Sequence, residues 1–292
     1  MDPSAIPPLF RFSQFEVPWA LGPPDGRYLI RRDGAGPAAP PSHVLVLATL
    51  GAQKPGLLRP SRRRRKAQPE PESSLVAITR ATIVELGDPL TTPQKAAAWL
   101  NGAGEPELAA GLGVLNRVLH SHRLAAADPH VHGIGRRDAL AARLGYGAGE
   151  EVADGLWTDA RELIDAGPRR RRTKVPAAQA RLAALLTARH HELACEELAL
   201  RARLDLDDGR AREAALQVLV ALDAALAELP EDPAAPALAD RLETLRGLHE
   251  GVAAAAQVAL AGPLGPSERA VTAFALERIE AALRARAAAL PG

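Results

Sequence analysis

The sequence predicts an α+β protein, in which a small N-terminal antiparallel β domain precedes a mainly α-helical C-terminal bundle. Residues 10–86 contain short runs rich in aromatic and β-branched residues, which are typical of strands. From Thr91 onward the apolar residues recur with helical spacing. The chain is 47% hydrophobic but only 3% aromatic, so its core is mostly Ala, Leu and Val, a composition that favours helix–helix packing.

The predicted β domain covers residues 1–90 and has four strands. The first contains Pro18, which predicts an edge position, because proline cannot donate to a strand ladder. Its apolar residues alternate in two phases, which predicts a bulge: Phe10 and Phe12, then Phe15, Val17 and Trp19. The other strands are Arg27–Arg32, His43–Leu50 and Leu75–Leu86. Residues 59–74 (RPSRRRRKAQPEPESS) predict a basic disordered loop.

Residues 91–166 predict a helical middle segment. Thr92 offers an N-cap, and Pro93 suits the first helical position. The predicted helices here include Leu108–Leu124, Asp138–Leu144 (ending at Gly145) and Val152–Ile164. Residues 167–175, which contain GPRRRRTK, predict a basic linker.

Residues 176–292 predict a helical bundle of four antiparallel elements, with prolines between the last three. The approximate bounds are 176–207, 210–229, 234–261 and 267–289. The first two elements meet at the turn Asp207-Asp208-Gly209, because Gly209 can take the left-handed conformation that ends a helix.

The helices around this turn carry the clearest apolar patterns. The second has one stripe, formed by Ala215, Leu219, Leu222, Leu226 and Leu229. Glu228 lies on its polar side, so we expect it to contribute little to stability. The first has two apolar faces, which predict that it is covered on two sides. One face holds Leu182, Leu186, Leu193, Leu200 and Leu204, and the other holds Ala194, Leu198, Ala202 and Leu206.

Charge is distributed unevenly along the chain, although the formal net charge is +1. Residues 1–174 carry a net +6 and residues 175–292 a net −5. The basic runs Arg62–Lys66 and Arg169–Arg172 account for much of this difference, and we interpret them as solvated segments. Only four of the 36 basic residues are lysines, so clustered arginines are weakly informative in this chain.

Cys195 is the only cysteine, which excludes an intramolecular disulfide framework. The sequence has no visible signal peptide and no apolar stretch long enough to span a bilayer. We therefore expect a cytoplasmic protein with no membrane partner.

The candidates for metal binding are Asp128, His130 and His132, in the segment Asp128-Pro129-His130-Val131-His132. This segment resembles the DxHxH motif of metal-dependent amidohydrolases, and that resemblance implies a zinc-dependent hydrolase. Amidohydrolases need an eight-stranded barrel, however, whereas the residues before Asp128 predict the end of a helix. We therefore expect no metal and interpret the segment as a polar loop.

Two further motifs occur between residues 140 and 154. The run Gly145-Tyr146-Gly147-Ala148-Gly149-Glu150 lacks the pattern of a nucleotide-binding loop, so we interpret it as a turn. The segment Leu140-Ala141-x-x-Leu144-Gly145 resembles the first helix of a helix-turn-helix. The recognition helix after it would carry Glu150, Glu151 and Asp154, which repel phosphates.

Three patterns in the bundle favour structural roles. His191-Glu192-x-x-Cys195 lacks the second histidine of a zinc-protease helix, and we interpret Cys195 as a small packing residue. His249 falls on an apolar helical face, which predicts a hydrogen-bonded core histidine. Glu197 and Arg201 are spaced for an ordinary helix-surface pair.

Two resemblances remain. Gly209–Leu222 is similar to the second half of a tetratricopeptide repeat, but no second copy follows, and a repeat array needs several units. The blocks PWALGPPDGRYLI, LNRVLHSHR and RLGYGAGEEVADG resemble an uncharacterised protein family of high-GC actinobacteria. That family has no assigned function, so the resemblance implies no catalytic or binding residues.

We expect a non-enzymatic protein–protein interaction or scaffold protein without a cofactor, because strong packing signals coexist with no convincing chemical site. One alternative is nucleic-acid binding through Arg62–Lys66, Arg169–Arg172 and the helix-turn-helix-like segment. The other is a metal-dependent hydrolase centred on Asp128, His130 and His132. The sequence leaves the oligomeric state open.

Overall fold

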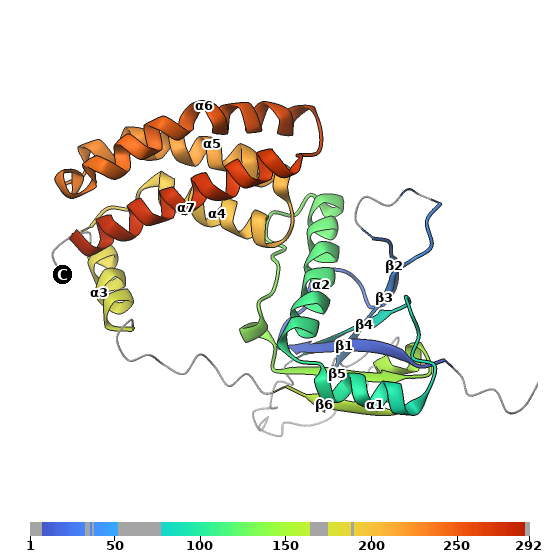
Figure 1. Cartoon of the computed structure of the whole chain (residues 1–292). Helices are drawn as coiled ribbons and strands as arrows, with labels where there is room; N and C mark the ends of the chain where they lie inside the picture. Colours follow the sequence, from blue (N-terminus) through green and yellow to red (C-terminus); the bar gives the residue numbers. More distant parts are fainter. Residues whose placement is uncertain are drawn as a thin grey trace, which may run out of the picture. The chain divides into compact units, whose positions relative to one another are not determined.

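Figure 1 shows a computed structural model of the chain, which describes residues 8–32, 36, 38–51, 77–163, 175–187 and 190–289. Of residues 175–180 it describes the backbone only. The chain divides into two compact units, Met1–Gly167 and Pro168–Gly292. The first contains an antiparallel sheet and the second is helical, which confirms the α+β class. The expected disordered loop at residues 59–74 and the linker at residues 167–175 lie almost entirely outside the described residues.

Among the described residues, the sheet of the first unit has six strands in the order β2-β3-β4-β1-β5-β6, with every neighbouring pair antiparallel. Their bounds are β1 Phe10–Val17, β2 Gly26–Ile30, β3 His43–Leu50, β4 Ile78–Glu85, β5 Ala141–Gly147 and β6 Asp159–Glu162. The first four agree with the strands that the sequence predicts. Helices α1 (Pro93–Gly102) and α2 (Glu105–Ala126) come between β4 and β5 in the chain. The N-cap of α1 is Thr92, as expected, and its Oγ1 accepts a hydrogen bond from the Lys95 amide at 3.2 Å.

The predicted bulge and edge position of β1 are both wrong. This strand lies inside the sheet and pairs residue by residue with β4 and β5. Pro18 follows the last strand residue, so its missing N–H interrupts no ladder bond. Apolar residues occur in both phases of β1 because both faces of the strand are covered. Phe15 packs in the core beneath the helices, whereas Phe12 stacks against Trp157 on the other face, with ring centroids 5.8 Å apart.

The helices predicted at Asp138–Leu144 and Val152–Ile164 are also wrong. The structure has a 3₁₀ turn (Arg136–Asp138), strand β5, a second 3₁₀ turn (Glu150–Asp154) and strand β6 in this region. Nearly every residue of β5 is buried, because the strand pairs on both edges and is covered on both faces. It therefore shows none of the alternation that identifies a half-exposed strand. The segment 91–166 is thus not wholly helical, and the sheet continues beyond residue 90.

Gly145 shows why the local sequence predicts the wrong element here. A glycine at this place is typical of a helix end, but Gly145 lies within β5, opposite Phe12. A Cβ at this position would lie 2.6 Å from Cζ of Phe12 and 2.6 Å from the carbonyl oxygen of Asp159. Glycine is therefore required by the close approach of an aromatic ring, which is a tertiary constraint.

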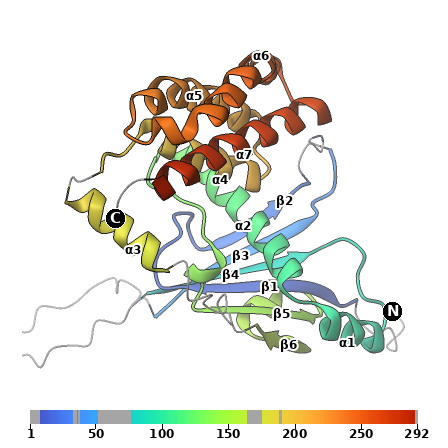
Figure 2. The same cartoon turned by 60° about the vertical axis from the view of Figure 1, so that its left-hand side comes forward.

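One face of the sheet carries the main core of the first unit. Helices α1 and α2 lie against it (Figure 2), and their apolar residues pack on side chains from β1, β3, β4 and β5. The largest fully buried side chains there are Phe15, Leu45, Leu47, Leu108, Leu115, Leu119 and Leu144. Gly111 allows α2 to approach the sheet closely, because a Cβ there would collide with Oγ of Ser13.

The second unit has five α-helices among its described residues, because the first predicted element is two helices. They are α3 Val175–Leu186, α4 Ala194–Asp207, α5 Ala211–Glu228, α6 Ala239–Ala261 and α7 Pro266–Ala289 (Figure 1). Two 3₁₀ turns, Leu229–Glu231 and Ala235–Leu238, connect α5 to α6. The expected turn between α4 and α5 is confirmed, with Gly209 at φ +75°.

The break between α3 and α4 has an identifiable cause in the capping of α4. Oε2 of Glu196 accepts a hydrogen bond from the Leu193 amide at 3.3 Å. Glu228, at the end of α5, accepts bonds from the Ala194 and Cys195 amides at 3.0 Å each. Three amide groups at the start of the helix are thereby satisfied, and a new helix begins at Ala194.

The core of the bundle agrees in part with the predicted stripes. On α5, Ala215, Leu222 and Leu229 are buried, whereas Leu219 and Leu226 are half-buried. The α4 face that contains Ala202 packs into the core. Leu200 and Leu204, on the other face, are 67% and 52% exposed. The prediction that this helix is covered on two sides is therefore wrong.

Candidate functional site

The histidine-rich segment occupies the surface that follows α2. Oδ1 of Asp128 accepts a hydrogen bond from the His130 amide at 2.9 Å, and His130 and His132 are both exposed. Within the described parts of the chain, no three His, Cys, Asp or Glu side chains are grouped so that they could hold a metal ion. The geometry thus offers no favourable arrangement for the hydrolase alternative.

The helix-turn-helix resemblance is wrong, because Leu144 and Gly145 lie in strand β5 and no helix spans 140–145. Residues 145–147 of the glycine-rich run belong to the same strand rather than to a turn. The basic runs Arg62–Lys66 and Arg169–Arg172 lie outside the described residues.

The four bundle residues for which the sequence predicts structural roles all lie in the described chain. Nε2 of His249 lies 2.8 Å from Oδ1 of Asp223, so the expected hydrogen bond is confirmed, but the side chain is 45% exposed and does not belong to the core. Cys195 is fully buried, and burial raises the pKa of its thiol, so the thiolate needed for nucleophilic chemistry is disfavoured. Glu197 and Arg201 form the predicted surface pair, with Oε1 and Nε 2.7 Å apart.

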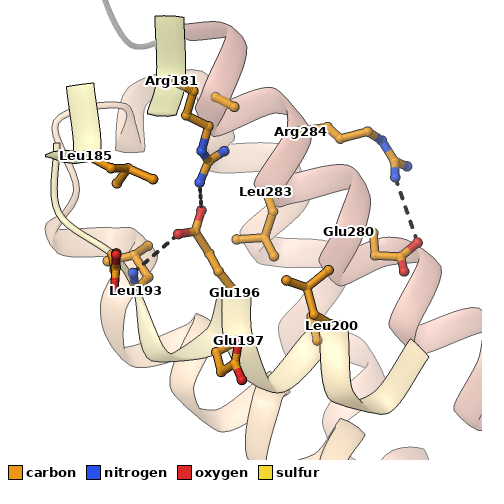
Figure 3. A pocket seen from close by; sticks show the side chains of 12 residues that line it. Arg181, Leu185, Leu193, Glu196, Glu197, Leu200, Glu280, Leu283 and Arg284 are labelled. Atoms are coloured by element: carbon orange, nitrogen blue, oxygen red, sulfur yellow. Dashed lines mark hydrogen bonds and ion pairs between the residues drawn. The ribbon is translucent and has the colours of Figure 1, made fainter. Parts of the chain in front are cut away.

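The second unit has a groove of about 650 Å³, which is lined by residues of α3, α4 and α7 and of the segment before α4. Figure 3 shows its side chains from close by. Leucines from all three helices line it, and charged side chains stand among them. The lining residues are Arg181, Leu185, Glu192, Leu193, Glu196, Glu197, Ala199, Leu200, Glu280, Leu283, Arg284 and Ala287. Below, "the groove" means this set.

Helical spacing brings the apolar side chains of the groove to one place. Leu193 and Leu200 are seven residues apart at the start of α4, so they lie on the same side of that helix. Leu283 and Ala287 are one turn apart on α7, and Leu185 comes from α3. Leu182, Leu186 and Leu204, on the same helices, are also exposed.

Ion pairs hold the helices of the groove together. The guanidinium of Arg203 on α4 binds both carboxylate oxygens of Glu280 on α7, at 2.8 and 3.1 Å. This interaction raises the pKa of Arg203, because hydrogen bonding to the carboxylate stabilises its charged form. Arg181 on α3 binds Glu196 on α4 (Figure 3). The walls of the groove are thus cross-linked by charges of opposite sign.

Beneath these pairs lies a buried arginine, Arg286 on α7. Its Nε donates to Oδ2 of Asp232 at 2.6 Å, its Nη1 to Oε1 of Glu196 at 3.1 Å, and its Nη2 to the carbonyl of His191 at 3.2 Å. Burial alone would raise the pKa of Asp232, but hydrogen bonds from the Ala234 amide and from Arg286 outweigh it, and the pKa is lowered. The cluster joins the start of α4, the α5–α6 connection and α7.

The chemistry of the groove suits binding. Its lining consists of leucines, alanines, glutamates and arginines, and no Ser, Thr, Cys or His stands among them to act as a nucleophile or proton shuttle. The sequence carries part of the signal for this site, because Leu193 and Leu200 belong to one predicted apolar face. An apolar helix face has the same spacing whether or not another helix covers it, so the spacing alone does not distinguish a core face from a groove.

Comparison with protein-family models, with curated proteins and with solved structures finds no match to this chain. The resemblance to an actinobacterial family therefore stays a prediction. The residues of the site carry the functional argument.

Proposed function

We propose that this chain is a non-enzymatic protein–protein interaction or scaffold protein, and that the groove is its partner-binding surface. The observation that supports this most is the apolar lining of the groove, in which Leu200 is exposed and three further leucines are half-buried: Leu185, Leu193 and Leu283. Leu200 is 67% exposed and borders a concave space of about 650 Å³. Apolar side chains around such a groove are typical of surfaces that receive a helix or a short chain segment.

Polar groups around the leucines would orient the partner. Glu197 and Arg284 are exposed at the groove, whereas Glu196 is committed to internal ion pairs. An interface with an apolar centre and a charged rim excludes water from its centre while the rim selects among partners.

The other functions that the sequence left open receive no comparable support. The segment that resembles a helix-turn-helix is a strand, which removes one of the features that favoured nucleic-acid binding. No group of side chains that could hold a metal ion for hydrolysis is found among the described residues. No helix in the described part of the chain is long and apolar enough to cross a membrane. A cytoplasmic location is part of this proposal.

The test compares two leucines of similar exposure. Leu200→Arg places a charge in the groove, and Leu260→Arg, at a position 61% exposed on α6, is the matched control outside it. Both variants should fold, since exposed substitutions usually change stability by no more than about 0.5 kcal/mol. Thermal unfolding of the purified chains checks this.

Binding is then measured by quantitative co-purification from the producing organism, together with sedimentation of the pure chain to detect self-association. The proposal predicts a stoichiometric protein partner, or a second copy, that is lost with Leu200→Arg and retained with Leu260→Arg. A partner that both variants retain would contradict the groove as the binding surface. No partner and no self-association for the wild-type chain would contradict the function itself.

A further inference from the structure

A second cavity, of about 160 Å³, lies within the first unit between the sheet and helices α1 and α2. It does not depend on the groove or on the function proposed above. Polar side chains from both the sheet and the helices line it. Strands supply Arg11, Ser13, His43 and Glu85, and the helices supply Trp99 and Glu107.

The antiparallel register explains why charged side chains meet here. His43 pairs with Glu85 across β3 and β4, and Arg11 lies beside Glu85 on the neighbouring strand. Nη1 of Arg11 is 3.6 Å from Oε2 of Glu85, which is too long for a hydrogen bond. The carboxylate is partly exposed to solvent, so the contact is a loose ion pair.

Arg11 has an unused donor at this place. Its Nε is buried and has no hydrogen-bond acceptor among the described residues. The guanidinium lies over the ring of Trp99, 5.7 Å from the ring centroid, a contact that favours this position of the cation. A buried donor without an acceptor costs free energy, and an acceptor placed in the cavity would remove that cost.

A second polar group lies next to the arginine. Ser13 is two residues along β1 from Arg11, on the same side of the strand, and it is buried under α2. Gly111 of α2 lines the cavity directly opposite Ser13, where any Cβ would collide with the hydroxyl. Glycine at that point leaves room for the Ser13 side chain, and Ser13 itself lines the cavity, so its hydroxyl can donate a hydrogen bond to a ligand there.

Charged side chains of both signs line the cavity. Arg11 and Glu85 are lining residues of opposite sign, and Oε2 of Glu107 is already committed to the Gly104 amide at 2.7 Å. His43 also lines the cavity. Burial lowers the pKa of His43 from its ordinary 6.5, and two arginines lower it further, whereas the charge of Glu85 raises it. The net effect lowers the pKa and favours the neutral imidazole at pH 7.

Those two arginines, Arg32 and Arg117, act on His43 but do not line the cavity. Arg11 is the only arginine or lysine among the described lining residues, and its Nε is the donor that lacks an acceptor there.

We propose that this cavity binds the carboxylate group of a small molecule, with Arg11 as its anchor and the Ser13 hydroxyl as a second donor. Arginine presents its N–H groups in a planar fork that matches the two oxygens of a carboxylate. The volume is below the roughly 300–1,000 Å³ of most pockets for drug-sized ligands, so the ligand is small.

The first experiment uses the full wild-type chain and three small probes: acetate, acetamide and inorganic phosphate. Acetamide has the size and shape of acetate without its charge, and phosphate is a tetrahedral anion. Nitrogen–proton correlation spectra follow the Nε–H signal of Arg11 and the indole signal of Trp99, at ionic strength held constant with sodium chloride. We expect acetate to shift both signals with a Kd about tenfold or more below that of acetamide, because its hydrogen bonds are charge-assisted.

The second experiment repeats the acetate titration with Arg11→Met and Arg136→Met. Arg136 also buries an Nε without an acceptor among the described residues, but it does not line the cavity. Acetate should still shift the Trp99 signal in Arg136→Met and should lose this effect in Arg11→Met. If Arg11→Met does not fold, the wild-type Nε–H titration remains decisive.

Three results would overturn the proposal. In the first, acetate leaves the Arg11 and Trp99 signals of the wild-type chain unchanged. In the second, acetamide and acetate act equally, so the charge is irrelevant. In the third, phosphate binds more tightly than acetate, so the site prefers a different anion.

Discussion

Glu228 provides the sharpest test of how the bundle is stabilised. Its sequence context predicts a polar surface position whose loss is harmless. In the structure, its two carboxylate oxygens accept hydrogen bonds from the Ala194 and Cys195 amides, 34 and 33 residues away, at 3.0 Å each. The residue therefore caps α4 from the end of α5, and a negative charge at a helix N-terminus is favourable.

Glu228→Ala should lower the free energy of unfolding of the second unit by about 2 kcal/mol. Hydrogen bonds to charged groups contribute about 1.5–3 kcal/mol, and removal of an N-cap side chain costs about 0.5–2 kcal/mol. For a unit of this size the change corresponds to a fall of roughly 6–8 °C in Tm. Glu250→Ala, at an exposed position of α6, is the control and should change Tm by less than about 2 °C.

The same interaction makes a prediction about pH. Burial would raise the pKa of Glu228, but hydrogen bonds from Cys195 and Ala194 and the charge of Arg286 outweigh it, and the pKa is lowered from its ordinary 4.5. The stabilisation is therefore complete above pH 4.5 and is lost as the pH falls through the folded-state pKa. Glu228→Gln should be less stable than wild type at neutral pH, and the difference should shrink in acid.

Thermal unfolding followed by circular dichroism at the helix band, from about pH 7 to about pH 3, measures both effects. Urea unfolding gives the free energies independently. If Glu228→Ala and Glu250→Ala unfold at the same temperature, the cap contributes nothing and the structural account of the α3–α4 break is wrong. A difference between wild type and Glu228→Gln that is constant with pH would show that the carboxylate charge is not involved.

Three further outcomes follow from burial and pairing. Leu222→Ala should cost about 2–5 kcal/mol in urea unfolding, because the side chain is fully buried; a change below about 0.5 kcal/mol would contradict its core position. Arg286→Met should cost about 3–5 kcal/mol, since it leaves Asp232 and Glu196 without their buried cation, and unchanged stability would show that these carboxylates do not depend on it. His130→Ala should leave Tm unchanged, and elemental analysis should find no stoichiometric zinc; one zinc per chain that is lost in this variant would restore the metal hypothesis.

The two proposed sites differ in how far the sequence could predict them. Leu193 and Leu200, which line the groove, are recognisable from their spacing as part of an apolar face, but whether such a face is core or surface depends on which helix lies against it. Arg11 and Glu85 are 74 residues apart, and only the pairing of β1 with β4 brings them together at one cavity. No local pattern marks either residue as part of a site.

The sequence by itself determined those elements whose signal is local. Strands β1 to β4 carry aromatic and β-branched runs, and α5, α6 and α7 carry helical periodicity between prolines, so their existence and type follow from a few neighbouring residues. Tertiary structure alone decided the rest. Strand β5 pairs with β1 and β6 along its two edges, and helices α1 and α2 and the 3₁₀ turn Glu150–Asp154 pack against it. Nearly all of its residues are therefore buried, and the alternation that would identify a half-exposed strand is absent. Glu228 acquires its role only because the end of α5 meets the start of α4, and hydrogen bonding between distant segments has no signature in the spacing of residues along one helix.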